Sequence, residues 1–101
     1  MDKAEQKLKS ILNEFFRDNF YKDGIIGLRE SLINKNNYKD YWEDIIRLII
    51  NRNMEKNTPF KLLSDAANIP LDENTDEEAY KWLLLMVINS QGNKNFKIIE
   101  Y

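Results

Sequence analysis

Apolar residues recur at intervals of three and four positions along most of the chain, the spacing that places side chains on one face of an α-helix. The pattern predicts helices at residues 3–20, 25–33, 38–53, 59–67 and 75–90. The tail at 96–101 alternates only partly between apolar and polar residues and has no second strand to pair with, so we expect an extended arm or a last helical turn. We therefore expect residues 1–101 to form one compact all-α domain of about five helices with a short C-terminal arm.

Residues that favour helix ends support two of these helix starts. Thr58 before Pro59 combines an N-cap hydroxyl with a proline at the first helical position. Thr75 with Glu78 three residues later forms a capping box. We expect helices to begin at both places.

Three further expectations concern the ends and the burial of the helices. Phe20 falls on the apolar stripe of the first helix, which predicts a core position. The pair Asp23–Gly24 is expected to end that helical unit, because glycine accepts the left-handed backbone that often follows a helix. The run 82–88 is apolar on every side, so we expect the last helix to be the most buried.

Composition limits the chemistry that is available. The 101 residues include no cysteine and no histidine, which excludes zinc sites and Ser–His or Cys–His nucleophile pairs. The adjacent carboxylates Glu43/Asp44 and Asp72/Glu73 do not share a helix face and would make poor acid–base pairs. We therefore expect no enzymatic activity and no cofactor.

The first residues and the longest apolar run bear on localisation. The N-terminus is charged and lacks the apolar segment of a signal peptide. The run 82–88 is the longest unbroken apolar stretch and is far shorter than a membrane span. These features predict a cytoplasmic protein that does not enter the membrane.

Negative charge is concentrated in one stretch, between Ser64 and Tyr80, which contains no Lys or Arg. The formal net charge is −2, and 15 Lys and Arg balance the other 11 of the 17 Asp and Glu residues. A stretch that carries only negative charges attracts basic partners and repels nucleic acid. The six carboxylates in this stretch are Asp65, Asp72, Glu73, Asp76, Glu77 and Glu78.

Two alternatives to partner binding apply to the acidic stretch. Acidic residues in the first helical turn are stabilised by the helix dipole, which explains 76–78 but not the carboxylates before Thr75. A Ca²⁺ or Mg²⁺ site is the other alternative, but the stretch lacks the alternating Asp-x-Asp-x-Asp-Gly loop. If residues 64–78 form a helix end, a turn and a helix start, the charges would crowd one corner.

We predict a partner-binding surface at this corner. Tyr80 lies one helical turn after Asp76 and Glu77, so it is expected to share their face and add apolar contact. Charge reversal at Asp76 and Glu77 should slow association and leave the fold nearly intact. The predicted partner-binding residues are Asp65, Asp72, Glu73, Asp76, Glu77 and Tyr80.

Residues 61–70 also resemble the first helix and turn of a helix-turn-helix. The second helix of such a motif would open with Thr75, Asp76, Glu77 and Glu78, which DNA phosphates would repel. We therefore expect no nucleic-acid binding. A regulatory or adaptor protein with a degenerate helix-turn-helix is retained as the alternative function.

Three segments carry a resemblance to a known group of proteins: 71–83, then Gly-Ile-Ile-Gly-Leu-Arg-Glu at 24–30, and 38–52. Over these segments the chain is similar to small helical immunity proteins of bacterial contact-dependent growth inhibition systems. The resemblance implies a cytosolic protein that binds the C-terminal domain of a secreted toxin and blocks it. Such toxins are often basic nucleases, whose phosphate-binding cleft an acidic surface can occupy. The interfaces differ between members, so no binding residue is carried over, and the oligomeric state is left open.

Overall fold

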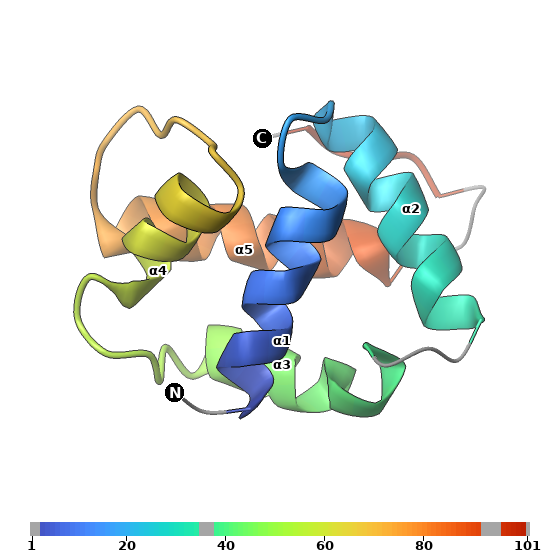
Figure 1. The fold of residues 1–101 in the computed structure, drawn as a ribbon, viewed down its shortest axis with the longest axis horizontal. Coiled ribbons are helices and arrows are strands. Elements are labelled where there is room, and N and C mark those ends of the chain that lie inside the picture. The colour runs from blue at the N-terminus through green and yellow to red at the C-terminus, as the bar shows by residue number, and fades with distance from the viewer. Residues whose placement is uncertain (1–2, 35–37, 92–95, 101) are drawn as a thin grey trace.

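The computed structural model describes residues 3–34, 38–91 and 96–100 (Figure 1). All regular elements within these residues are helical, which confirms the expected all-α fold of about five helices. Two of the helices continue into a π-helical segment, and a 3₁₀ turn precedes a third. In chain order the elements are α1 (Lys3–Ile11), η1 (Leu12–Phe16), α2 (Tyr21–Ile33), η2 (Lys39–Tyr41), α3 (Trp42–Ile50), α4 (Thr58–Lys61), η3 (Leu62–Ala66) and α5 (Asp76–Ser90).

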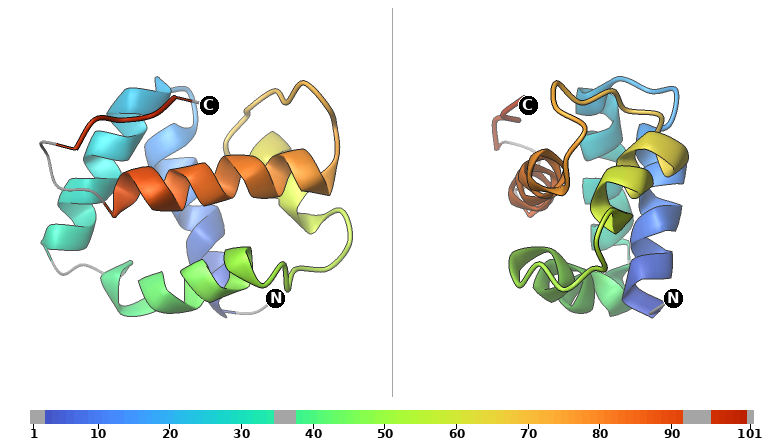
Figure 2. Two further views of the ribbon diagram at one scale, coloured as in Figure 1. Left: turned by 180° about the vertical axis from the view of Figure 1, so that it is seen from behind. Right: turned by 90° about the vertical axis from the view of Figure 1, so that its left-hand side faces the viewer.

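The helices surround one apolar core. Helix α5 lies on one side of the molecule and α1 with η1 on the other, as the right-hand view of Figure 2 shows. Helix α2 packs against η1 and α5, and α4 packs against α5 nearer the start of that helix. The large side chains that these elements bury completely include Leu8, Ile11, Leu12, Leu83 and Met86.

The first helical unit ends earlier than the apolar stripe predicts. The helical backbone stops at Phe16, and Asp18 takes the left-handed conformation with φ of 56°. Phe20 is consequently 80% exposed, so its predicted core position is wrong. The 3.6-residue periodicity places Phe20 in register with Phe16, but this register has no meaning once the helix has ended.

Gly24 lies inside α2 and does not end a helix, so the prediction for Asp23–Gly24 is also wrong. A Cβ atom at Gly24 would lie 2.6 Å from the Phe16 ring and 2.7 Å from the Phe15 carbonyl oxygen. Glycine is therefore needed here because α2 packs closely on η1, and not because of its backbone freedom.

Two further predicted boundaries differ. Helix α3 is preceded by the 3₁₀ turn η2 and ends at Ile50, before Arg52 takes φ of 51°. Thr58 is the first residue of α4, and the N-cap position belongs to Asn57, which has φ of 72° and makes no side-chain cap.

Helix α5 follows the prediction at both ends. The Thr75 hydroxyl accepts a hydrogen bond from the Glu78 backbone N–H at 3.3 Å, and the helix ends at Ser90. It buries eight of its residues, although Leu84 and Ile88 are 41% and 43% exposed. The part of the tail that is described, 96–100, is an extended arm, one of the two conformations expected for it. In the described part of the chain, no helix is long and apolar enough to cross a membrane.

Candidate partner-binding surface

The fold separates the six carboxylates of the acidic stretch. Asp65 lies in η3, the pair Asp72 and Glu73 lies in the loop 67–75, and Asp76, Glu77 and Glu78 form the first turn of α5. The tertiary contacts of each group decide which charges remain available to a partner.

The Asp76 carboxylate caps a different helix from its own. Its Oδ2 accepts a hydrogen bond from the Asn57 backbone N–H at 2.7 Å, and its Oδ1 accepts one from the Phe60 N–H at 3.2 Å. Asp76 thus does for α4 what the Thr58 hydroxyl was expected to do, since it satisfies N–H groups that have no partner within the helix. Reversal of the Asp76 charge would remove both hydrogen bonds and destabilise α4. The expectation that Asp76 can be reversed with the fold nearly intact therefore does not agree with the structure.

Asp65 lies apart from Asp76 and among cations. It lies in η3, near the C-terminal end of the helical segment whose N-terminus Asp76 caps. Asp65 shares a surface hollow with Lys9 and Lys61, and its backbone carbonyl accepts a hydrogen bond from Arg17 Nη1 at 2.7 Å. Asp65 therefore lies in a different environment from the other five carboxylates, whereas the sequence led us to expect all six at one corner.

Four carboxylates of the stretch, those of Asp65, Asp72, Glu73 and Glu77, are exposed and make no hydrogen bond or ion pair with any described residue. Asp72, Glu73 and Glu77 lie in the loop 67–75 or at the start of α5, and we call these three the acidic loop surface. Glu78 differs from them, since it is half-buried and its Oε1 lies 3.9 Å from Lys81 Nζ. The acidic loop surface is thus a smaller region of negative charge than the sequence predicts, formed by the loop 67–75 and the start of α5.

Tyr80 does not belong to this surface. It is 7% exposed, its hydroxyl accepts a hydrogen bond from the Met54 N–H at 3.3 Å, and the Arg52 guanidinium lies 5.2 Å from its ring centroid. Burial raises the pKa of Tyr80 above its usual value. The predicted exposed aromatic side chain is instead part of the core.

Phe20 is the exposed aromatic residue that the sequence pattern missed. It lines a shallow hollow of about 380 Å³ together with Asn68 and Pro70, at the beginning of the loop that carries Asp72 and Glu73. The polar run Arg17-Asp18-Asn19 before Phe20 was the available signal that the helix stops before this residue. An exposed aromatic residue close to a charged loop is typical of binding hot spots.

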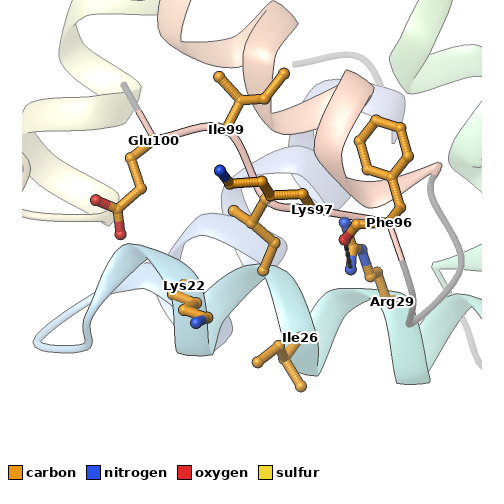
Figure 3. Close-up of a pocket in the computed structure, with 8 residues that line it drawn as sticks. Lys22, Ile26, Arg29, Phe96, Lys97, Ile99 and Glu100 are labelled. Carbon is orange, nitrogen blue, oxygen red and sulfur yellow. Dashed lines mark hydrogen bonds between the residues drawn. The ribbon is translucent and has the colours of Figure 1, made fainter.

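Arg29 is a second group that the sequence did not reveal. It is 6% exposed, its Nε donates to the Asn89 carbonyl oxygen at 2.7 Å, and its Nη1 donates to the Phe96 carbonyl oxygen at 3.2 Å. Figure 3 shows its side chain extending from α2 towards Phe96. The guanidinium also lies 5.8 Å from the centroid of the Phe96 ring. It therefore joins three segments that are distant in the sequence.

Two alternative functions can be compared with these observations. No group of three or more Asp or Glu side chains in the described residues is placed to hold a metal ion. The connection between η3 and α5 covers nine residues, 67–75, whereas the turn of a helix-turn-helix has three or four.

Comparisons with known proteins identified no relative of this chain. No protein-family model matches the chain, and no curated protein or solved structure matches it significantly.

Proposed function

We propose that this protein is a stoichiometric inhibitor that binds a basic toxin domain, as an immunity protein of a contact-dependent growth inhibition system, in the bacterial cytoplasm. The observation that carries the proposal is the acidic loop surface, where Asp72, Glu73 and Glu77 are exposed and have no cationic partner among the described residues. Unpaired carboxylates attract the Lys and Arg residues of a nuclease cleft. The protein acts by occupying that cleft and performs no reaction itself.

The proposed interface combines charge with one apolar anchor. Phe20 is 80% exposed beside the start of the same loop, so it can be buried by a partner that contacts Asp72 and Glu73. The carboxylates accelerate association, whereas the aromatic side chain slows dissociation. Asp76 and Tyr80, which were also predicted to bind the partner, are assigned to the fold. Asp65, the remaining predicted residue, lies in η3 beside Lys9 and Lys61 and is left out of this interface.

The experiment is calorimetry with the purified toxin domain encoded immediately upstream, at two salt concentrations. The expected result is binding with Kd on the order of nanomolar that weakens as salt increases. Absence of binding would overturn the proposal and favour the regulatory or adaptor alternative. Binding that is tight but indifferent to salt would move the interface away from the acidic loop surface.

A matched pair of triple variants locates the surface. Reversal of Asp72, Glu73 and Glu77 to Lys should slow association about tenfold or more, because electrostatic steering is lost. The control reverses three exposed acidic residues elsewhere, Asp23, Glu30 and Asp40, with the same change of net charge. Equal slowing in both variants would show that only net charge matters. Circular dichroism checks that both variants are folded.

A separate variant tests the anchor. Phe20→Ala should leave the association rate nearly unchanged and increase the dissociation rate about tenfold, as truncation of an aromatic hot spot does. Leu84→Ala is the control, because Leu84 is a large exposed apolar residue on α5. If both variants dissociate as slowly as the unaltered protein, Phe20 is not part of the interface.

A further inference from the structure

The C-terminal arm, residues 96–100, has one edge that is hydrogen-bonded and one that is open. Ile99 uses both its N–H and its carbonyl oxygen towards the Asn89 side chain of α5, at 2.9 Å and 2.7 Å. In an extended chain the N–H and C=O of one residue point to the same side, and those of the next residue point to the opposite side. The backbone groups of Ile98 and Glu100 therefore point away from Asn89.

A hydrogen bond from Arg29 shows which way the open edge faces. The Phe96 carbonyl oxygen, which alternates in step with those of Ile98 and Glu100, accepts a hydrogen bond from Arg29 Nη1 of α2 at 3.2 Å. The open edge is therefore directed towards α2. The backbone groups of Ile98 and Glu100 make no hydrogen bond with any residue that the structure describes. An unpaired edge of this kind is a template for pairing with another chain.

The open edge borders a hollow of about 780 Å³ between the arm and α2 (Figure 3). Lys22 and Ile26, which lie one helical turn apart on α2, form part of the opposite wall. Three large apolar side chains that line this hollow, those of Ile26, Phe96 and Ile99, are 42%, 43% and 52% exposed. A groove between a free strand edge and an apolar surface is typical of sites that bind an extended peptide, because the edge bonds to the main chain and the surface accepts side chains.

The charges around the hollow favour an acidic occupant. Lys22 and Lys97 line the hollow, are exposed and form no ion pair with any described residue. Among the described residues of the lining, only Glu100 is acidic. The arm of a second copy carries one Lys and one Glu within residues 96–100 and so no net negative charge. A partner segment with carboxylates is therefore more complementary to this basic lining than a second copy is.

We propose that the hollow between the arm and α2 binds an extended acidic segment of a partner protein, which adds as a strand to the open edge of the arm. The main chain of the segment bonds to the backbone of Ile98 and Glu100, and its apolar side chains cover Ile26. Because Ile98 packs towards the core, Lys97 faces outward, where carboxylates on the other face of the segment lie beside it. The site uses no residue of the acidic loop surface and does not depend on the proposed inhibition.

The probe is the acetylated and amidated peptide Val-Glu-Val-Glu-Val, and its basic counterpart is Val-Lys-Val-Lys-Val, each titrated into the full chain and followed by NMR. We expect the acidic peptide to bind about tenfold more tightly, because its charges complement the lining. The amide signals of Ile98 and Glu100 should move downfield and exchange more slowly, whereas that of Ile99, which already bonds to Asn89, should not change. Equal binding of the two peptides, or unchanged signals at Ile98 and Glu100, would overturn the proposal.

N-methylation of alternate peptide residues tests the addition of a strand. The valine N–H groups of an extended peptide lie on one edge and the glutamate N–H groups on the other. Methylation of the set that faces the arm should weaken binding about tenfold or more, and methylation of the other set should leave it nearly unchanged. Equal affinity of the two methylated peptides would show that the peptide adheres without pairing to the arm, and would contradict the proposal.

A matched pair of variants on α2 locates the site. Ile26→Ala removes an exposed apolar side chain that the peptide covers and should weaken binding about fivefold. Ile33→Ala is the control, because Ile33 is 67% exposed on the same helix and does not line this hollow. Both side chains are exposed, so both variants should remain folded. Unchanged affinity in Ile26→Ala would contradict the site. Dimerisation that Ile26→Ala abolishes, without peptide binding, would assign the open edge to a second copy and overturn the proposal.

Discussion

Asn89 and Ile99 pair through two hydrogen bonds, so that a side-chain amide takes the place of a neighbouring strand. Asn89 Nδ2 donates to the Ile99 carbonyl oxygen at 2.7 Å, and the Ile99 N–H donates to Asn89 Oδ1 at 2.9 Å. Asn89 is fully buried, whereas the Ile99 side chain is 52% exposed. Polar contacts therefore hold this part of the C-terminal arm on α5, in addition to the packing of Ile98 against the apolar core.

Replacement of Asn89 by Ala should release the arm. The backbone groups of Ile99 and the Tyr21 hydroxyl, which accepts from Asn89 Nδ2 at 2.8 Å, would all lose their partner. We expect the free energy of unfolding to fall by about 1–3 kcal/mol, together with faster hydrogen exchange at the Ile99 amide. Asn13→Ala, at an exposed position in η1, is the control. Undiminished protection at Ile99 would show that burial holds the arm.

Two glycines of α2 should respond oppositely to alanine. Gly24→Ala places a Cβ 2.6 Å from the Phe16 ring and 2.7 Å from a backbone oxygen that cannot move away freely, and should cost about 1–3 kcal/mol. Gly27→Ala meets only the half-buried Phe15 ring, at 3.0 Å, and gains helix propensity of about 1 kcal/mol, so the change should be close to zero or stabilising. Urea unfolding of both variants measures the difference. A loss at Gly27 as large as that at Gly24 would contradict the close packing inferred at Gly24.

Phe16 and Phe20 lie four residues apart and should differ strongly in their effect on stability. Phe16 is 3% exposed and its ring packs edge-on against Trp82 with centroids 5.1 Å apart, so Phe16→Ala should cost about 3–5 kcal/mol. Phe20 is 80% exposed, so Phe20→Ala should change the free energy of unfolding by less than about 0.5 kcal/mol. Thermal or urea unfolding provides the measurement. If both variants lowered the free energy of unfolding by similar amounts, Phe20 would have to be buried in the core.

Stability should decrease in alkaline solution because the pKa values of Tyr21, Tyr38 and Tyr80 are all raised above the usual value, in each case chiefly by burial. Burial raises the pKa of Tyr21, an effect that the hydrogen bond from Asn89 opposes and the charge of Glu100 reinforces. Burial likewise raises the pKa of Tyr80 above the usual 10.0, and the hydrogen bond from Met54 opposes this. Above about pH 10 the unfolded chain loses these protons first and the folded protein binds more of them, so the free energy of unfolding falls as pH rises.

Urea unfolding between about pH 8 and pH 11 measures this effect. Below the ordinary tyrosine pKa these side chains are protonated in either state and contribute no slope. Tyr21→Phe and Tyr80→Phe should each make the alkaline decline less steep. A decline as steep in the double variant as in the unaltered protein would assign the effect to other groups.

The carboxylate roles show what the sequence could and could not predict about the site. The capping of α5 by Thr75 was predictable, because the donor, at Glu78, lies three residues away in the chain. The capping of α4 by Asp76 was not, because its partners Asn57 and Phe60 lie 19 and 16 residues away. The number of carboxylates could therefore be read from the sequence. Which of them stabilise the fold and which are exposed could not.

The sequence by itself determined the all-helical class, the position of α5 and the presence of an acidic stretch. These properties depend on the 3.6-residue periodicity and on caps that act within four residues. Only the tertiary structure decided that Phe20 is exposed, that Tyr80 is buried and that Arg29 meets the carbonyl of Asn89, 60 residues away. Burial and hydrogen bonding of these side chains depend on how separate helices pack, and no spacing along the chain encodes that arrangement.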